Sequence, residues 1–242
     1  MRHRFTLPIM LLMLLLSTRL FAASSTGNAP IINTWLILGA FDNSGNKGFD
    51  SDLIGEANTA PVLGKQDAGM TWNYFDDRLF SRNYDDYQDL YSYYVVKQDK
   101  SATAKTVYMH VYVYSPKDND VQLRLQADYE YKAWINGKLV STGSSPIASG
   151  WVDSGFWHSK SDGDGLVPYY GKDTFRIPIH LNSGWNRLLL KVANQEEGLF
   201  GLYARISDSN GNAVPGLIYS LNGGEGKLAV ATSGLDEIKT GN

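Results

Sequence analysis

The stretch Ala127-Asp128-Tyr129-Glu130-Tyr131-Lys132-Ala133-Trp134-Ile135-Asn136-Gly137-Lys138-Leu139-Val140 decides the fold class of this chain. Aromatic and aliphatic residues precede Asn136-Gly137, and a second apolar run follows it. Asn-Gly accepts a positive φ at both central positions of a two-residue turn, which is the geometry that joins twisted antiparallel strands. The stretch therefore predicts a β-hairpin.

Strand-like alternation continues on both sides of this hairpin. In residues 106–114, four apolar residues alternate with His110 and the tyrosines 108, 112 and 114. We expect the apolar face in the core, and the tyrosine face is either a flat adsorption surface or the second face of a half-covered sheet. Similar runs occupy residues 121–125, 174–179, 187–192 and 200–206. Because Pro178 lacks a backbone donor, its strand is predicted at a sheet edge.

Many short strands separated by turn residues are typical of an all-β protein. We predict a single antiparallel β-sandwich with long loops, because about 220 residues commonly form one such domain. The longest irregular regions are residues 39–105 and the Gly-, Ser- and Asp-rich segment 141–172. Connections of that length are usually functional or disordered.

The first 23 residues have the features of a secretory signal peptide. Arg2, His3 and Arg4 are basic, residues 7–16 are apolar, and Phe21-Ala22-Ala23 ends in small residues suited to cleavage. The apolar run is shorter than the ~20 residues that a spanning helix needs. We therefore expect a secreted or periplasmic protein with no membrane span after signal removal, a sandwich over 24–221 and a flexible polar tail over 222–242.

Charge and cysteine content narrow the classes of partner. Residues 1–23 hold three of the 22 Lys and Arg and none of the 25 Asp and Glu, so the rest of the chain has a net charge of −6. An acidic protein repels phosphate backbones, which argues against nucleic acid as a partner. The chain has no Cys, and secretion without disulfides favours a bacterial source.

Three stretches, in a consistent order, resemble the galactose-binding-like jelly-roll sandwiches found in many carbohydrate-binding modules. They are Ile32 to Phe41 followed by Gly48-Phe49-Asp50, the Trp134 hairpin, and Gly184 to Val192 followed by Gly201 to Ile206. Ala40 stands where that family usually has Pro, and Asp128-Tyr129-Glu130 replaces its commoner Asp-Asp-Gly. The resemblance implies a jelly roll that binds glycan or polysaccharide, often with a structural calcium ion.

Aromatic and polar residues of the loops are the candidate ligand-binding residues. Sugar binding needs flat apolar faces and nearby polar groups in a preformed concavity. Segment 141–172 holds tryptophans that no periodic core pattern explains, and they form either a ligand platform or a lid on one end of the sandwich. The candidates are Trp151, Trp157, His158, Tyr169 and Tyr170, with Asp128 and Tyr129 at the mouth of the hairpin and Trp72 in the earlier irregular region.

The other three tryptophans lie in strands or at strand starts. Trp35, Trp134 and Trp185 match motif positions that pack inside the sandwich, so we expect them in the core.

Two oxygen-rich clusters are candidate calcium sites. Asp162 and Asp164 are separated by one residue among glycines, which lets a loop wrap oxygens around a hard cation. Asp42, Asn43, Asp50 and Asp52 form the second cluster. The alternative is that all of these are solvated turn residues.

No sequence signature of an enzyme is present. The chain lacks a Gly-x-Ser-x-Gly elbow, a His-Glu-x-x-His helix and a phosphate loop. A non-catalytic, lectin-like carbohydrate-binding sandwich that uses loop aromatics is therefore the favoured function. Two alternatives stay open: a protein-interaction, adhesion or effector module, and a hydrolase or lyase with a pair of carboxylates in a groove.

Overall fold

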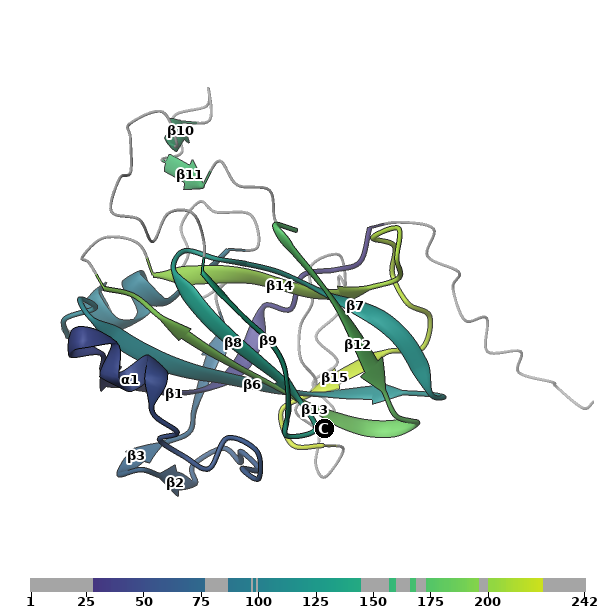
Figure 1. Ribbon diagram of the computed structural model, residues 1–242, viewed down its shortest axis with the longest axis horizontal. Coiled ribbons are helices and arrows are strands. Elements are labelled where there is room, and N and C mark those ends of the chain that lie inside the picture. Colours follow the sequence, from purple (N-terminus) through teal and green to yellow (C-terminus); the bar gives the residue numbers. More distant parts are fainter. Residues whose placement is uncertain are drawn as a thin grey trace, which may run out of the picture.

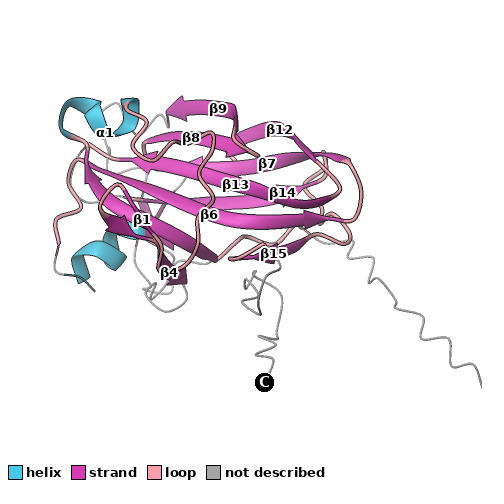
Figure 2. Ribbon diagram, turned by 90° about the horizontal axis from the view of Figure 1, so that it is seen from below, coloured by secondary structure: helices cyan, strands magenta, loops and turns pink. Residues whose placement is uncertain are grey.

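The computed structural model describes residues 28–76, 87–96, 98, 100–144, 157–159, 166–168, 173–195 and 200–223. The described chain is an all-β sandwich of two antiparallel sheets, as the sequence predicts. The strands of both sheets run along the long direction of the molecule, with the short helix α1 (Lys47–Asp50) at one end (Figures 1 and 2).

The larger sheet carries the hairpin. Its strands, in spatial order, are β4 (Asn73–Asp76), β1 (Thr34–Asp42), β6 (Lys105–Ser115), β13 (Gly184–Ala193), β8 (Glu130–Ile135) and β9 (Lys138–Ser144), and β15 (Ile218–Ser220) also pairs with β6.

The second sheet has the order β12 (Phe175–Leu181), β7 (Asn119–Ala127), β14 (Gly201–Ser207) and β5 (Gln88–Asp89). Strand β12 is at the edge, so the prediction from Pro178 is confirmed. Two small two-stranded sheets lie apart from this pairing: β2 (Gln66–Asp67) with β3 (Met70–Thr71), and β10 (Trp157–Ser159) with β11 (Leu166–Pro168). The short helical segments are η1 (Ser44–Asn46) and η3 (Ser92–Val96).

The core lies between the two sheets and follows the predicted alternation. Val107, Met109, Val111 and Val113 of β6 are fully buried, and alternate residues of β7, β12 and β14 meet them from the other sheet. Burial of this apolar area is the main favourable term in folding, at roughly 25 cal/mol per Å². The core forms without any covalent cross-link.

The outer face of the larger sheet is covered by residues 44–72. Tyr108 and His110 of β6 are both fully buried there. The Tyr108 hydroxyl donates to Glu56 at 2.7 Å, and His110 packs edge-on against Trp72 with ring centroids 6.4 Å apart. Tyr112 and Tyr114, further along β6, are partly exposed. The tyrosine face is thus half covered.

The hairpin turn forms as predicted, and it also contacts the covering segment. Asn136 and Gly137 have φ values of 51° and 83°. The Asn136 side-chain oxygen accepts from the Arg187 backbone N–H at 2.8 Å. A Cβ placed on Gly137 would lie 1.9 Å from the Ala57 carbonyl oxygen. The turn therefore requires glycine for two reasons, its positive φ and its close approach to residue 57.

We expect Gly137→Ala to lower the free energy of unfolding by about 2–3 kcal/mol, because it combines a positive φ with a backbone clash. Gly55→Ala is the matched control, since Gly55 has a φ of 73° and open space around the added Cβ, and only its conformational cost of about 1 kcal/mol remains. Urea denaturation of both variants measures the difference. Equal losses would show that the contact with residue 57 contributes nothing.

Trp35 and Trp134 lie in the core, at 0% and 5% exposure, but the expectation for Trp185 is wrong. Trp185 is 38% exposed and packs edge-on against Tyr114 on the outer face of the larger sheet. The reason is its register in β13, where it lies directly opposite Tyr114 and so shares the outer face with the tyrosines.

Candidate functional site

A polar cavity of about 390 Å³ opens at the start of the hairpin. Its described lining residues come from four separate parts of the chain: Gly45, Asn46, Tyr129, Glu130, Ser144 and Gln195. Tyr129 is one of the residues predicted from the sequence, and the other five are new.

The turn before α1 forms one wall of this cavity. Gly45 and Asn46 both have positive φ, at 60° and 65°, a conformation that Gly and Asn adopt at least cost. The fully buried Asn43 side chain holds this turn in place through hydrogen bonds. Its side-chain oxygen accepts from the Phe49 backbone N–H at 2.8 Å, and its amide donates to the Asn194 carbonyl at 3.1 Å.

Asn46 connects the turn to the other walls. Its amide donates to one carboxylate oxygen of Glu130 at 3.1 Å, and its side-chain oxygen accepts from the Gln195 amide at 2.6 Å. Because each bond joins a different segment, the three polar side chains are held in fixed relative positions.

The second carboxylate oxygen of Glu130, Oε2, is buried and has no hydrogen-bond partner among the described residues. An unsatisfied buried acceptor costs about 1–3 kcal/mol relative to a paired one, more when it is charged. Because this oxygen has almost no accessible surface, the groups that a ligand in the cavity would meet are the other polar atoms of the lining side chains. The arrangement is suited to a ligand that exchanges hydrogen bonds with amide and carboxylate groups.

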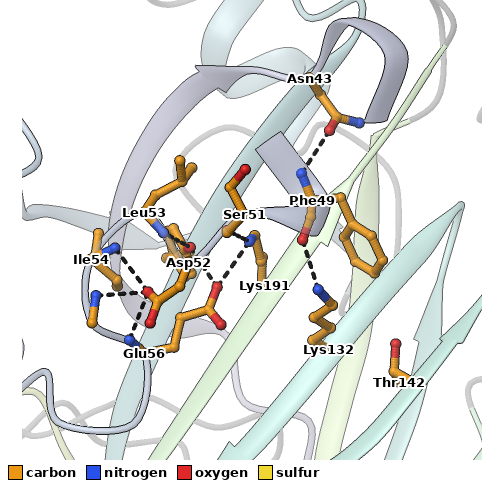
Figure 3. A network of polar contacts seen from close by, with 12 residues as sticks. Asn43, Phe49, Ser51, Asp52, Leu53, Ile54, Glu56, Lys132, Thr142 and Lys191 are labelled. Carbon is orange, nitrogen blue, oxygen red and sulfur yellow. Dashed lines mark hydrogen bonds and ion pairs between the residues drawn. The ribbon is translucent and has the colours of Figure 1, made fainter. Parts of the chain in front are cut away.

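The wall is anchored to the sheet by a polar network behind it (Figure 3). Lys132 of β8 donates to the Phe49 carbonyl at 2.8 Å, and its ammonium lies 4.5 Å from the centre of the Phe49 ring. Lys191 of β13, fully buried, pairs with Glu56 at 2.9 Å and donates to the Ser51 carbonyl at 2.6 Å. These contacts fix residues 49–56 on the sheet, so the cavity is preformed.

Of the two residues predicted at the mouth of the hairpin, Tyr129 lines the cavity and Asp128 does not. Tyr129 is only 5% exposed, so it forms part of the wall and does not project as a platform. Asp128 is buried and accepts a hydrogen bond from the hydroxyl of Tyr87, which packs with Ile31 and Tyr203 in a cluster separate from the main core. Burial raises the pKa of Asp128 to about 7.

Trp72 is the last residue of the covering segment, and its side chain is fully buried against the sheet. Its indole N–H donates to Asp67 at 2.8 Å, and its ring packs on His110. Trp72 is therefore a packing residue in this structure, distant from the surface that a ligand reaches.

The remaining predicted residues belong to segment 141–172. Trp157 and His158 lie in β10, opposite Pro168 and Val167 of β11. Trp151, Tyr169, Tyr170, Asp162 and Asp164 fall outside the described residues, so their roles stay predictions.

The second oxygen-rich cluster is not assembled into a cation site. Asp42 accepts from Ser44, the Asn43 side chain bonds to the backbone of Phe49 and Asn194 and to the Asn46 side chain, and the Asp52 carboxylate accepts from the backbone N–H groups of residues 54–56. Across the described part of the chain, no three His, Asp or Glu side chains converge as a metal would require.

Comparisons with known proteins give no family. No family model matches the chain, and no curated protein does. Among solved structures, it is similar to a β-glucosidase from Kluyveromyces marxianus, with a TM-score of 0.37 and 11% identity. The match covers 78% of this chain and 20% of that one, so the chain spans about a fifth of the enzyme's length. At this similarity we draw no conclusion about function from it.

The described residues include no helix long and apolar enough to cross a membrane.

Proposed function

We propose that this protein is a secreted β-sandwich that binds carbohydrate without cleaving it. The observation that carries the proposal is the cavity lined by Asn46, Tyr129, Glu130 and Gln195, in which hydrogen bonds hold the amide and carboxylate groups in fixed positions. Sugar hydroxyls donate and accept hydrogen bonds over short distances, and carboxylate and amide groups held in fixed positions match them.

The lining favours binding over hydrolysis. Glycoside hydrolysis by the usual mechanisms needs two carboxyl groups on opposite sides of the scissile bond. Glu130 is the one carboxylate among the described lining residues. Asp128, its close neighbour in the chain, is buried and engaged with Tyr87.

The residues that follow β9 are also part of the proposed site. Ser144 lines the cavity and ends β9, immediately before the residues that lead to Trp151 and Trp157. We include these tryptophans as the flat apolar faces of the site, and the Asp162-Gly163-Asp164 loop as a calcium-binding element beside it. Export through residues 1–23 places the binding site where extracellular glycans occur.

A glycan array with purified residues 24–242 tests this function. We expect selective binding of soluble oligosaccharides, weakened about tenfold or more by Glu130→Gln, because a hydrogen bond to a charged group contributes about 1.5–3 kcal/mol. Asp50→Asn is the matched control, since Asp50 is exposed and lies outside the cavity. A folded wild-type protein that binds no glycan would refute the proposal and favour a protein partner.

Two further arms test the parts contributed by segment 141–172. A Trp151→Ala/Trp157→Ala variant is expected to lose binding while keeping its fold, and a chelator is expected to weaken binding if calcium orders the Asp162 loop. Unchanged binding in the double variant would assign recognition to the cavity alone.

A further inference from the structure

The hydrogen bonds of the cavity run in one direction and end on a carboxylate. The Gln195 amide donates to the Asn46 side-chain oxygen at 2.6 Å, and the Asn46 amide donates to Glu130 at 3.1 Å. The Asn43 amide also donates to that Asn46 oxygen, at 3.3 Å. Glu130 is therefore the last acceptor of the chain of bonds, and its partner is a neutral amide.

No positive side chain of the described residues forms an ion pair with Glu130. Lys132, two residues further along β8, is the nearest lysine in the sequence, but its ammonium donates to the Phe49 carbonyl (Figure 3). Lys191 pairs with Glu56 instead. The other described lining residues are glycine, serine, tyrosine and amides. Within that lining, Glu130 therefore carries a negative charge that no cation neutralises.

Part of this charge is also shielded from water. Glu130 is half-buried, and its Oε2 atom is inaccessible and has no hydrogen-bond partner among the residues that the structure describes. Water solvates a partly buried charge less well than an exposed one. Attraction to an opposite charge acts through space and needs no contact with the buried oxygen. A cation in the cavity would therefore stabilise the whole carboxylate.

The charge of the chain favours the same class of ligand. Residues 24–242 contain 19 Lys and Arg against 25 Asp and Glu, which gives the net charge of −6. An acidic protein attracts positively charged polymers over a long range and repels negatively charged ones. Sugars with carboxyl or sulfate groups are therefore disfavoured both at a distance and at Glu130.

We propose that the cavity selects glycans that carry free amino groups, with an ammonium group of the sugar against the Glu130 carboxylate. This inference rests on the proposed function for glycan as the ligand, and it adds the charge of that glycan. A hydrogen bond from an ammonium to a carboxylate is roughly twice as strong as one between neutral groups. N-acetylation of the sugar turns the ammonium into a neutral amide and removes this advantage.

Glucosamine and N-acetylglucosamine oligosaccharides of equal length test this selection in calorimetric titrations at about pH 6, where amines are protonated and Glu is ionised. We expect wild-type protein to bind the amino form about tenfold more tightly at low salt, and added salt to reduce that ratio. Glu130→Gln keeps an acceptor for the Asn46 amide without the charge, so it is expected to bind both forms equally.

Asp50→Asn is the matched control for this selection. It removes one exposed acidic charge outside the cavity and is expected to keep the preference of the wild type. Thermal unfolding checks that both variants fold.

Failure of this inference and failure of the proposed function give different results. Wild-type protein that binds the two forms equally, prefers the N-acetylated form, or binds only other glycans of the array would overturn the selection and leave carbohydrate binding standing. A preference that Glu130→Gln retains would also overturn it, because the selecting charge would lie elsewhere. Folded wild-type protein that binds no glycan would refute both.

Discussion

Asp128→Asn is expected to change how the stability of the protein depends on pH. The Asp128 side chain is buried, accepts from the Tyr87 hydroxyl, and leaves its Oδ1 atom without a hydrogen-bond partner in the described structure. Burial raises its pKa to about 7, and the nearby Asp89 acts in the same direction. The folded state therefore keeps a proton that the unfolded chain loses above about pH 4.

The sign follows from this difference in bound protons. Between about pH 4 and pH 7 the unfolded chain binds fewer protons than the folded one, so the free energy of unfolding falls as the pH rises. One proton corresponds to about 1.4 kcal/mol per pH unit, or about 4 kcal/mol over the whole interval. Asp128→Asn removes this loss, since the amide has no charge to desolvate.

His110 acts in the opposite direction over almost the same range. Burial, with a smaller effect of the Arg187 charge, lowers its pKa to about 3, so the unfolded chain gains a proton below about pH 6.5 that the folded chain excludes. Stability contributed by His110 is complete above that pH and is lost as the pH falls. In the wild type the two contributions cancel in large part between pH 4 and 6.5.

Urea denaturation from pH 4 to pH 8 separates the two groups. Asp128→Asn is expected to grow more stable as the pH rises to 6.5, because the contribution of Asp128 no longer opposes that of His110. His110→Phe is the complementary variant, and its stability is expected to fall over the same range. Both ring nitrogens of His110 lack partners among the described residues, so this change removes no hydrogen bond. Parallel curves for wild type and Asp128→Asn would contradict a neutral buried carboxyl.

The strands and the hairpin were predictable because their signals are local. A period of two in β6 and β12, and Asn136-Gly137 between apolar runs, depend only on neighbours in the sequence. The buried faces of these strands follow from that alternation.

The position of the covering segment, residues 44–72, was not predictable from the sequence. It explains why the exposure of residues on β13 differs from what their alternation and motif positions predict. β13 alternates Leu188 and Leu190 inside with Leu189 and Lys191 outside, yet all four are buried because residues 44–72 lie over the outer face. The same segment stops short of Trp185, which therefore stays exposed although its motif position suggests the core. The local sequence around Trp185 carries no information about where the distant covering segment ends.

The cavity was visible in the sequence only at the mouth of the hairpin. Tyr129 and Glu130 belong to a polar stretch that begins a strand, which is a signal of a loop-end site. Asn46 and Gln195 are 84 and 149 residues from their partners Glu130 and Asn46, respectively. Only the folded chain brings these amides together, through the turn that Asn43 and the lysines of β8 and β13 hold in place.

Lys191→Met is expected to lower the free energy of unfolding by about 3–5 kcal/mol, the usual cost of removing one partner of a buried ion pair. Lys191 is fully buried between the Phe49 and Tyr108 rings, and burial lowers its pKa while Glu56 opposes that shift. Methionine fills the same space but leaves the Ser51 carbonyl without this donor, and the Glu56 carboxylate without its counter-charge and with the Tyr108 hydroxyl as its remaining donor.

Two controls assign this loss to the charge pair, measured by urea denaturation. Lys132→Met removes a more exposed lysine that donates to the Phe49 carbonyl, and we expect a loss of about 1 kcal/mol. Lys191→Met/Glu56→Gln removes both charges and is expected to recover part of the stability, because no buried charge is left alone.

Since residues 49–56 hold the turn that carries Asn46, Lys191→Met is also expected to weaken glycan binding at the cavity without touching a lining residue. A loss near 1 kcal/mol for Lys191→Met, equal to that of Lys132→Met, would mean that apolar packing alone holds the covering segment on the sheet.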